Sequence, residues 1–268
     1  MNRRIAFVGG GNMAYALATR LAQRTFDVVV SEPLAEQRAR FVPPVSTTPD
    51  NTVALQDASS VVLAVKPQVL ESVVREIGPR MRDDQLVVSI AAGVPMAAIE
   101  RWLGTGRAVV RCMPNTPALV GAGISGVIAN AAATPDQRNE AETILRTAGE
   151  VVWFDTDADL DAVTALSGSG PAYFFAVIEA LAAAGTNIGL DPATAKRLVV
   201  ATARGAAIMA TDDDPSELRA RVTSPGGTTA RALSILAERS FPESLAAAVR
   251  GAFERSRELA HELSDESN

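Results

Sequence analysis

Short apolar segments rich in β-branched residues alternate with longer segments of helical periodicity over the first 155 residues. The segments that we predict to be strands span residues 4–8, 27–31, 60–65, 86–90, 108–112, 124–129 and 151–155. The helices predicted between them span residues 13–24, 33–41, 69–77, 96–103 and 135–148. This alternation indicates βαβ units and a mostly parallel sheet. The strands are apolar on both faces, which is typical of a doubly wound sheet covered by helices on both sides.

The pattern changes near residue 160. Five helices are predicted after that point, over residues 171–185, 191–210, 215–222, 226–239 and 242–263, with no convincing strand. Asp191-Pro192 and Asp214-Pro215 each place a capping residue before a proline at the first helical position. We therefore predict an α/β domain over residues 1–160 and an all-α domain over residues 161–268.

Small residues are concentrated in the helical part, in segments such as 180–185 and 201–210. Small side chains let helices approach closely. A compact helical bundle is one interpretation of this composition. We favour a dimer interface, because about 105 residues of thin helices make a poor independent core.

Composition and charge narrow the possible functions. The 268 residues are 47% apolar and 21% charged, and the formal net charge is −6. This is ordinary for a globular protein and lacks the basic footprint of a nucleic-acid-binding protein. The chain has one cysteine, Cys112, and one histidine, His261, so neither an intramolecular disulfide nor a metal site built from His and Cys is expected. We interpret Cys112 as a packing residue and His261 as a solvated helix residue.

Two uncharged segments, 112–135 and 162–178, are the candidates for membrane insertion. Prolines and glycines interrupt both, which favours buried or ligand-lining backbone over a membrane span. The first residues lead directly into a predicted strand, without an apolar signal segment. A cytoplasmic location with no membrane partner is therefore expected.

A glycine turn follows the first predicted strand and precedes the first predicted helix. Gly9, Gly11 and Ala14 form the pattern G-x-G-x-x-A. The first glycine permits a tight turn, the second lets backbone approach a pyrophosphate, and the alanine lets the helix pack on the strand. The helix, which begins near Asn12 and Met13, offers its positive end to the anion. This context predicts a dinucleotide-binding Rossmann domain.

The second strand ends at Glu32, 21 residues after Gly11. A carboxylate at this place accepts hydrogen bonds from the adenine ribose and repels a 2′-phosphate unless an arginine intervenes. Arg38 and Arg40 follow on the next predicted helix, but neither directly succeeds the acid. We therefore expect NADH to be tolerated, while the sequence leaves the preference between NADH and NADPH open. The alternative is that Glu32 is a solvated residue at the start of a helix.

Six segments together resemble pyrroline-5-carboxylate reductase, the last enzyme of proline synthesis. They span residues 7–14, 64–68, 89–94, 111–117, 165–173 and 222–229, and the last is the signature of that family. The resemblance implies an N-terminal Rossmann domain and a C-terminal helical domain that interlocks in a homodimer, with higher multiples of dimers left open. It also implies reduction of 1-pyrroline-5-carboxylate to L-proline with NADPH or NADH, by hydride transfer from nicotinamide C4 to the imine carbon.

The resemblance also implies which further residues contact the cofactor. These are Asn51, Ala64, Val65, Lys66 and Pro67, then Ala91, Ala92 and Gly93 beside the nicotinamide half, and Asn115. The segments that contain Lys66 and Ala92 follow strand ends, where ligands of open α/β sheets bind. One departure from the family is Ser31-Glu32-Pro33, which puts the usual preference for NADPH in doubt.

The substrate, a small ring with a carboxylate and a C=N bond, needs an anion site and a partner for its nitrogen. We predict that Ser224, Gly226, Gly227, Thr228 and Thr229 bind it, because the glycines let successive amides converge on an anion and the next helix adds its positive end. Thr229 is the predicted catalytic residue, with its hydroxyl bonded to the ring nitrogen. The alternative is a glycine-rich interhelix loop in which Thr228 is the N-cap.

Ser169 lies in a second glycine turn, Ser167–Tyr173, which either joins the sheet to the helices or lines the cleft that faces the nicotinamide. We favour the second role and predict that Ser169 binds substrate.

Two other functions remain as alternatives. A β-hydroxyacid dehydrogenase needs a base, which its relatives supply as a lysine on the long helix after the sheet domain, and residues 171–184 contain no lysine. A noncatalytic dinucleotide-sensing dimer would have no reason to keep the segment 224–229.

Overall fold

The computed structural model describes residues 3–24, 26–104 and 106–265. The chain divides into two compact units. The first unit comprises Met1–Ser169 together with Ala252–Asn268, and the second comprises Gly170–Gly251. The last helix is therefore shared, because its first part belongs to the second unit and its end to the first.

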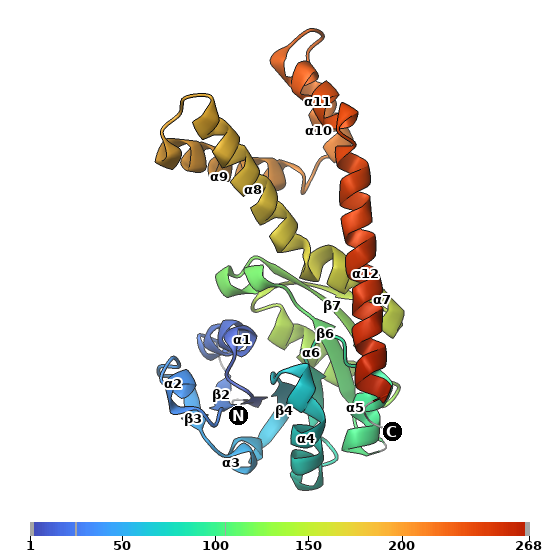
Figure 1. Ribbon diagram of the computed structural model, residues 1–268. Coiled ribbons are helices and arrows are strands. Elements are labelled where there is room, and N and C mark those ends of the chain that lie inside the picture. Colours follow the sequence, from blue (N-terminus) through green and yellow to red (C-terminus); the bar gives the residue numbers. More distant parts are fainter. Residues whose placement is uncertain (1–2, 25, 105, 266–268) are drawn as a thin grey trace. The chain divides into compact units, whose positions relative to one another are not determined.

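The first unit is built on a sheet that has eight strands among the described residues. The strands are β1 (Arg4–Val8), β2 (Asp27–Ser31), β3 (Ser46–Thr48), β4 (Ala58–Leu63), β5 (Leu86–Ser89), β6 (Val109–Met113), β7 (Gly123–Ala129) and β8 (Gly149–Trp153). Their order is β3-β2-β1-β4-β5-β6-β7-β8. Figure 1 labels β2, β3, β4, β6 and β7. Neighbouring strands are parallel except β6 and β7, which are antiparallel. The predicted doubly wound, mostly parallel sheet is confirmed.

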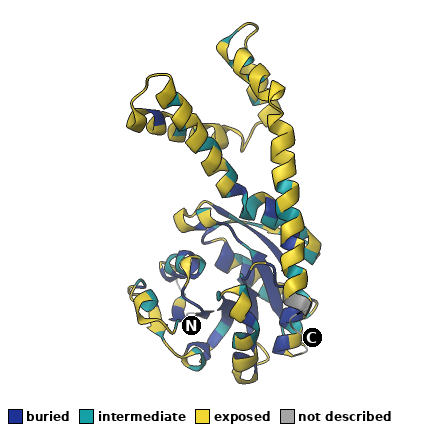
Figure 2. Ribbon diagram, viewed as in Figure 1, coloured by how far each residue is buried: buried dark blue, intermediate teal, exposed yellow. Residues whose placement is uncertain are grey.

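Helices cover the sheet on both faces, as the apolar strands require. On one face, α1 (Asn12–Ala22) and α6 (Pro135–Leu145) pack against the strands. On the other face lie α3 (Asn51–Leu55), α4 (Pro67–Ile77) and α5 (Met96–Leu103). Figure 2 shows the strands buried between these layers.

Several predicted bounds are wrong by a few residues. The strand predicted over 60–65 is β4, which starts at Ala58 and ends at Leu63, so that two apolar residues leave the ladder. The helix predicted over 33–41 is the four-residue α2 (Ala35–Arg38). The edge strand β3 and the short helix α3 were not predicted, because three and five residues carry too little periodicity.

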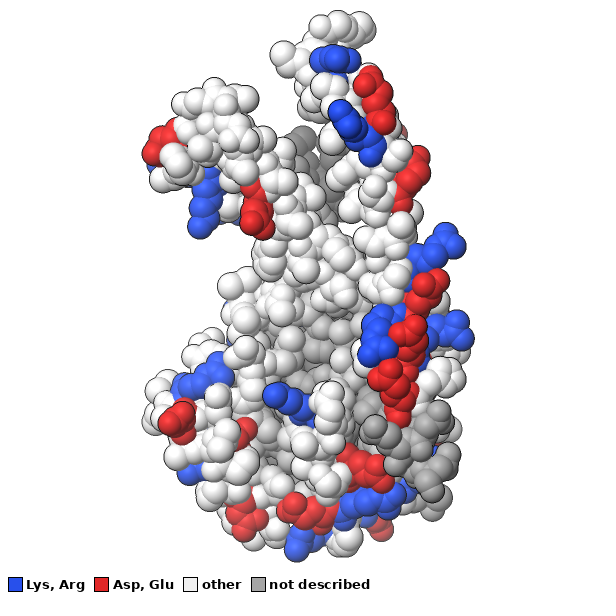
Figure 3. Space-filling view, viewed as in Figure 1, with Lys and Arg blue, Asp and Glu red and all other residues white. Residues whose placement is uncertain are grey.

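Short helical segments connect these elements. They are η1 (Gly78–Arg80), η2 (Thr116–Val120), α7 (Asp157–Val163) and the π-helical η3 (Thr164–Gly168). The end of α12 (Phe241–Asp265) packs with this first unit, where the Ser256 hydroxyl donates a 2.9 Å hydrogen bond to the buried Asp161 carboxylate. Figure 3 shows blue and red side chains interspersed along this helix, in agreement with the ion pairs of Arg255 to Glu258 and Glu262.

The second unit is helical throughout its described length. It contains α8 (Gly170–Asn187), α9 (Pro192–Met209), α10 (Pro215–Arg221), α11 (Thr228–Glu238) and the first part of α12, as predicted. The helices α8 and α9 approach closely, since a Cβ atom on Gly185 would lie 3.1 Å from that of Ala195. Small residues therefore let these two helices of one chain approach closely, and the dimer interface stays a prediction.

Large apolar side chains of the second unit face solvent in the single chain. Phe174 is 71% exposed and Ile188 is 82% exposed, and Figure 2 shows α8 to α11 almost wholly exposed. The expectation that segment 162–178 is buried or lines a ligand is thus wrong for Phe174 and Phe175 within one chain. Among the described residues one helical stretch, Asp157–Asn187, is long and apolar enough to span a membrane by length and composition alone, and its apolar window is 11% buried.

Candidate dinucleotide and substrate sites

The glycine turn after β1 is formed by contacts that admit no side chain. Gly9 has a φ of 103°, a conformation that residues with a Cβ atom rarely adopt. Its N–H donates to the Ser31 carbonyl over 2.8 Å, and an added Cβ atom would lie 2.7 Å from the Ala64 carbonyl oxygen. The turn therefore joins the ends of β1, β2 and β4, and only glycine fits there.

Gly11 and the start of α1 form the open side of the same turn. An added Cβ atom on Gly11 would meet nothing within 4 Å, and no side chain caps the helix. The first turn of a helix has N–H groups without an intrahelical acceptor and carries partial positive charge. This end of α1 therefore fits a pyrophosphate.

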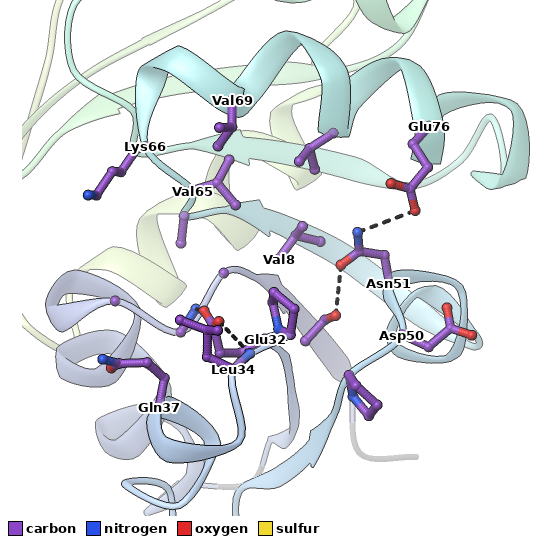
Figure 4. A pocket seen from close by; sticks show the side chains of 18 of the residues that line it. Val8, Glu32, Leu34, Gln37, Asp50, Asn51, Val65, Lys66, Val69 and Glu76 are labelled. Carbon is purple, nitrogen blue, oxygen red and sulfur yellow. Dashed lines mark hydrogen bonds between the residues drawn. The ribbon is translucent and has the colours of Figure 1, made fainter.

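A cavity of about 980 Å³ opens next to this helix end. It is lined by Val8, Gly9, Gly10, Gly11, Asn12, Ser31, Glu32, Pro33, Leu34, Gln37, Arg40, Pro49, Asp50, Asn51, Ala64, Val65, Lys66, Val69, Val73 and Glu76. Figure 4 shows Glu32, Leu34 and Gln37 on one side, and Val65, Lys66 and Val69 on the other. The volume and the mixture of apolar, polar and charged lining residues suit a large ligand such as a dinucleotide.

Glu32 is held at the rim of this cavity by backbone amides. Its carboxylate accepts hydrogen bonds from the N–H groups of Gly10, over 2.9 Å, and Leu34, over 3.0 Å. The guanidinium of Arg38 donates to the carbonyl oxygens of Glu32 and Pro33 and so stiffens the same turn. The negative charge therefore has a fixed place at the end of β2.

Asn51 and Lys66 line the cavity from different elements. The Ser31 hydroxyl donates to the Asn51 amide oxygen over 2.7 Å, and the amide nitrogen of Asn51 faces Glu76 at 3.5 Å (Figure 4). Lys66 is the N-cap of α4, and Pro67 occupies the first position of that helix. Ala64 and Val65 lie between the end of β4 and this helix, and both line the cavity.

A second cavity of about 370 Å³ lies within the first unit. It is lined by Pro67, Gln68, Ala92, Gly93, Thr164, Ser169, Ala252, Arg255, Ser256 and Leu259. Ser169 thus lies with Ala92 and Gly93 at one cavity. Pro67 lines this cavity and its neighbour Lys66 lines the larger one, so both cavities reach the start of α4.

A partly buried ion pair supports the loop that contains Gly93. The N–H of Met96, at the start of α5, donates to both oxygens of the Asp157 carboxylate, over 3.1 and 3.3 Å. The guanidinium of Arg111, which is 4% exposed, pairs with the same carboxylate. Asp157 therefore links the end of the loop to β6 and α7.

Ser224–Thr229 forms a turn in the second unit. The N–H of Gly227 donates to the Ser224 carbonyl over 3.0 Å, and Gly226 has a φ of 71°. Gly227 is the N-cap of α11, without a side-chain cap, so the alternative in which Thr228 is the N-cap is wrong. The amides of the first turn of α11, including that of Thr229, lack an intrahelical acceptor and suit a carboxylate.

The structure distributes the predicted residues over these places. Gly9, Gly11, Asn12, Glu32, Asn51, Ala64, Val65 and Lys66 line the large cavity, and Pro67, Ala92, Gly93 and Ser169 line the second one. Met13, Ala91 and Asn115 line neither, and the same holds for the predicted substrate residues Ser224, Gly226, Gly227, Thr228 and Thr229. The buried Asn115 accepts from the Ile124 N–H and donates to the Ser167 carbonyl, which holds η2 and η3 near β7.

Cavity residues that come from distant elements carry no local sequence signal. Arg255 and Ser256 reach the second cavity from α12, and Gln37 reaches the large one from α2. Cys112 is not a nucleophile, since burial raises the pKa of its thiol to about 12 and keeps it protonated. Its predicted packing role fits this burial.

Known proteins and protein families are similar to both parts of the chain. Residues 157–259 match the family described as pyrroline-5-carboxylate reductase dimerisation, and residues 4–93 match NADP oxidoreductase coenzyme F420-dependent. The chain is 46% identical to the pyrroline-5-carboxylate reductase of Pseudomonas aeruginosa, over 97% of this chain and 98% of that one. A solved pyrroline-5-carboxylate reductase from Coxiella burnetii has a TM-score of 0.90 and 39% identity, covering 97% of this chain and 99% of its own. The Plasmodium falciparum enzyme, solved with NADP bound, has a TM-score of 0.87 and 30% identity, covering 97% and 98%.

The Rossmann sheet, the glycine turn and its cavity define a dinucleotide-dependent oxidoreductase with an added helical unit. The sequence similarity to these relatives covers both units and not only the one that contains the sheet. The chain belongs to the pyrroline-5-carboxylate reductase family.

Proposed function

We propose that the chain reduces 1-pyrroline-5-carboxylate to L-proline, with NADPH or NADH as reductant and Thr229 bonded to the ring nitrogen. The observation that carries the proposal is the combination of a dinucleotide cavity with the Ser224–Thr229 turn in one chain. Relatives that match nearly the whole chain bear the name of this reductase.

The residues around the large cavity fit a dinucleotide. The turn at Gly9 and the uncapped end of α1 would hold the pyrophosphate, and Glu32 would face the adenine ribose. Leu34 and Val69, both exposed apolar side chains, line opposite sides of the cavity, where a flat base would lie between them (Figure 4). The segment around Ala92 and Gly93 would then border the nicotinamide.

The turn before α11 fits the carboxylate of a small ring. The amides of the first helical turn would bind the carboxylate, and Ser224 and Thr228 add exposed hydroxyls. Thr229 is partly buried one residue further along, so that one short segment offers both an anion site and a hydroxyl for the nitrogen.

The reaction requires little acid–base catalysis by protein side chains. When bound, the reduced dinucleotide supplies the hydride that forms the new C–H bond at C5 of the ring. The ring nitrogen takes a proton that originates from water and becomes the secondary amine. The task of Thr229 is to hold the nitrogen by a hydrogen bond and so to fix the orientation of the C=N bond.

The proposal also covers the oligomeric state and the cellular location. The exposed apolar side chains of α8 and α9, together with the match to a dimerisation family, support a homodimer or a higher multiple of dimers. We place the reaction in the cytoplasm. Nucleic acid and membrane are not proposed as partners.

The role of Thr229 is tested by two substitutions. Loss of one hydrogen bond that leaves a partner unpaired costs roughly 1–3 kcal/mol, or about one to two decades in rate. Thr229→Ala is therefore expected to lower kcat with pyrroline-5-carboxylate by about that factor, whereas Thr229→Ser retains much of the activity. Dinucleotide binding, followed by nicotinamide fluorescence, is expected to stay near normal in both.

Thr223→Ala is the matched control, because the Thr223 hydroxyl, two residues after the end of α10, donates to the Arg219 carbonyl of that helix. Near-native turnover in Thr229→Ala would show that backbone or water holds the nitrogen instead. Turnover of 2-hydroxy or 2-keto acids in place of the pyrroline would favour a β-hydroxyacid dehydrogenase, and dinucleotide binding without turnover would favour a sensor.

A further inference from the structure

Arg40 is a cation fixed at the adenine end of the large cavity. Its guanidinium donates to the Asn12 side-chain oxygen over 2.9 Å and to the Gln37 side-chain oxygen over 2.8 Å. It also lies over the ring of Tyr15, 5.0 Å from the centroid. Three neutral partners thus hold this group in one place before any ligand arrives.

The charge of Arg40 is not neutralised by the protein. Among the described residues it forms no ion pair with a carboxylate, whereas Arg75, Arg107 and Arg111 each have an acidic partner. A partly buried, immobilised guanidinium without an anion at a cavity wall is suited to a phosphate, which it binds in a planar, bidentate manner.

Other cations near the cavity are placed differently. The Arg38 guanidinium donates hydrogen bonds to the carbonyl oxygens of Glu32 and Pro33, and Arg38 does not line the cavity. Lys66 lies on the opposite side from Glu32 and Gln37 (Figure 4). Arg40 is thus the cation that the structure fixes beside Gln37, on the side of the cavity where Glu32 lies.

Glu32 and Arg40 together bear on the choice of dinucleotide. The carboxylate of Glu32 suits the free 2′-hydroxyl of NADH and opposes the 2′-phosphate of NADPH. We propose that Arg40 admits the 2′-phosphate, so that one ribose corner accepts both dinucleotides. This inference rests on the dinucleotide site of the proposed function, but not on the reaction that follows.

Two adenine nucleotides that differ only in the 2′-phosphate provide the test. Adenosine 2′,5′-bisphosphate and adenosine 5′-monophosphate are titrated into the native protein and Arg40→Met by calorimetry. A lost charge-assisted hydrogen bond to phosphate corresponds to about a tenfold to hundredfold change in affinity. Arg40→Met is expected to lose that much affinity for the bisphosphate and less than about threefold for the monophosphate.

Two further variants separate charge from structure. Arg40→Lys keeps the charge without the planar guanidinium and is expected to bind the bisphosphate with intermediate affinity. Arg146→Met removes one exposed positive charge from the end of α6, outside both cavities, and is expected to change neither affinity.

The outcomes separate this inference from the proposed function. Unchanged bisphosphate binding in Arg40→Met, or an equal loss for both nucleotides, would overturn the role of Arg40. Failure of the native protein to bind either nucleotide would instead overturn the dinucleotide site itself. Absence of reductase activity in a protein that binds both nucleotides would leave the Arg40 result standing.

Discussion

Glu32 has two roles at the scale of a single residue. Its carboxylate accepts from the Gly10 and Leu34 amides, which shapes the turn, and its charge faces the cavity. A neutral residue at this place removes the charge that opposes a 2′-phosphate. We therefore expect cofactor preference to depend on this one side chain.

We predict that Glu32→Ser lowers KM for NADPH and raises KM for NADH. Removal of a partly exposed like charge is worth roughly 1 kcal/mol, about fivefold. Steady-state kinetics with each dinucleotide measures the shift. Glu36→Ser, an exposed change of the same charge on α2, is the control and leaves both constants near their native values. An unchanged preference in Glu32→Ser would mean that the carboxylate faces away from the ribose.

Sequence indicates some of these residues and not others. Gly9, Gly11 and Glu32 are predictable because a local motif fixes their spacing from the ends of two strands. Arg40 and Arg255 are not, because contacts with other elements bring them to the cavities. Tyr15 and Asn12 hold Arg40 from α1, and they precede it in the chain by 25 and 28 positions.

The junction of β6, α5 and α7 is the clearest case at the scale of elements. The Asp157 carboxylate accepts from the Met96 amide and pairs with the buried Arg111. A buried cation left without its partner is costly, so loss of Asp157 alone is expected to destabilise the first unit.

Asp157→Ala is expected to lower the free energy of unfolding by about 3 kcal/mol, because it leaves the Arg111 guanidinium without its anion. Denaturant unfolding at neutral pH, followed by tryptophan fluorescence, measures the loss. Asp155→Ala, an exposed acid two residues earlier, should cost little. Equal stability of the two variants would show that Arg111 finds a replacement partner.

Element bounds show where local pattern stops being informative. The run 60–65 does not reveal that β4 ends at Leu63, because Ala64 and Val65, which border the cavity, are apolar as well. The unpredicted β3 is a three-residue edge strand that pairs only with β2. Long, strongly periodic helices such as α9 were predicted to within about a residue.

At the scale of the whole molecule, the order of elements made the fold class predictable. The division into compact units does not follow the order of the chain, because residues from Ala252 onward belong to the unit that contains the sheet. The hydrogen bond between Ser256 and Asp161 joins residues that are 95 positions apart, and no local sequence pattern predicts such a contact. The two-domain boundary predicted near residue 160 remains a prediction about architecture.

Assembly gives a prediction at the same scale. The apolar side chains of α8 and α9 require cover, so light scattering is expected to give a mass of at least twice 28.0 kDa. Phe174→Asp is expected to shift the protein towards monomers. Val42→Asp, at an exposed apolar position in the first unit, is the control. A fully active native monomer at all concentrations would contradict this assignment.

The most direct test of the account is product analysis with the purified chain. The protein is incubated with 1-pyrroline-5-carboxylate and either NADPH or NADH, and L-proline is quantified by mass spectrometry against the dinucleotide oxidised. We predict one L-proline for each dinucleotide oxidised, with both cofactors supporting the reaction. Dinucleotide oxidation without L-proline, or no oxidation with this substrate while a keto acid is reduced, would contradict the proposed function.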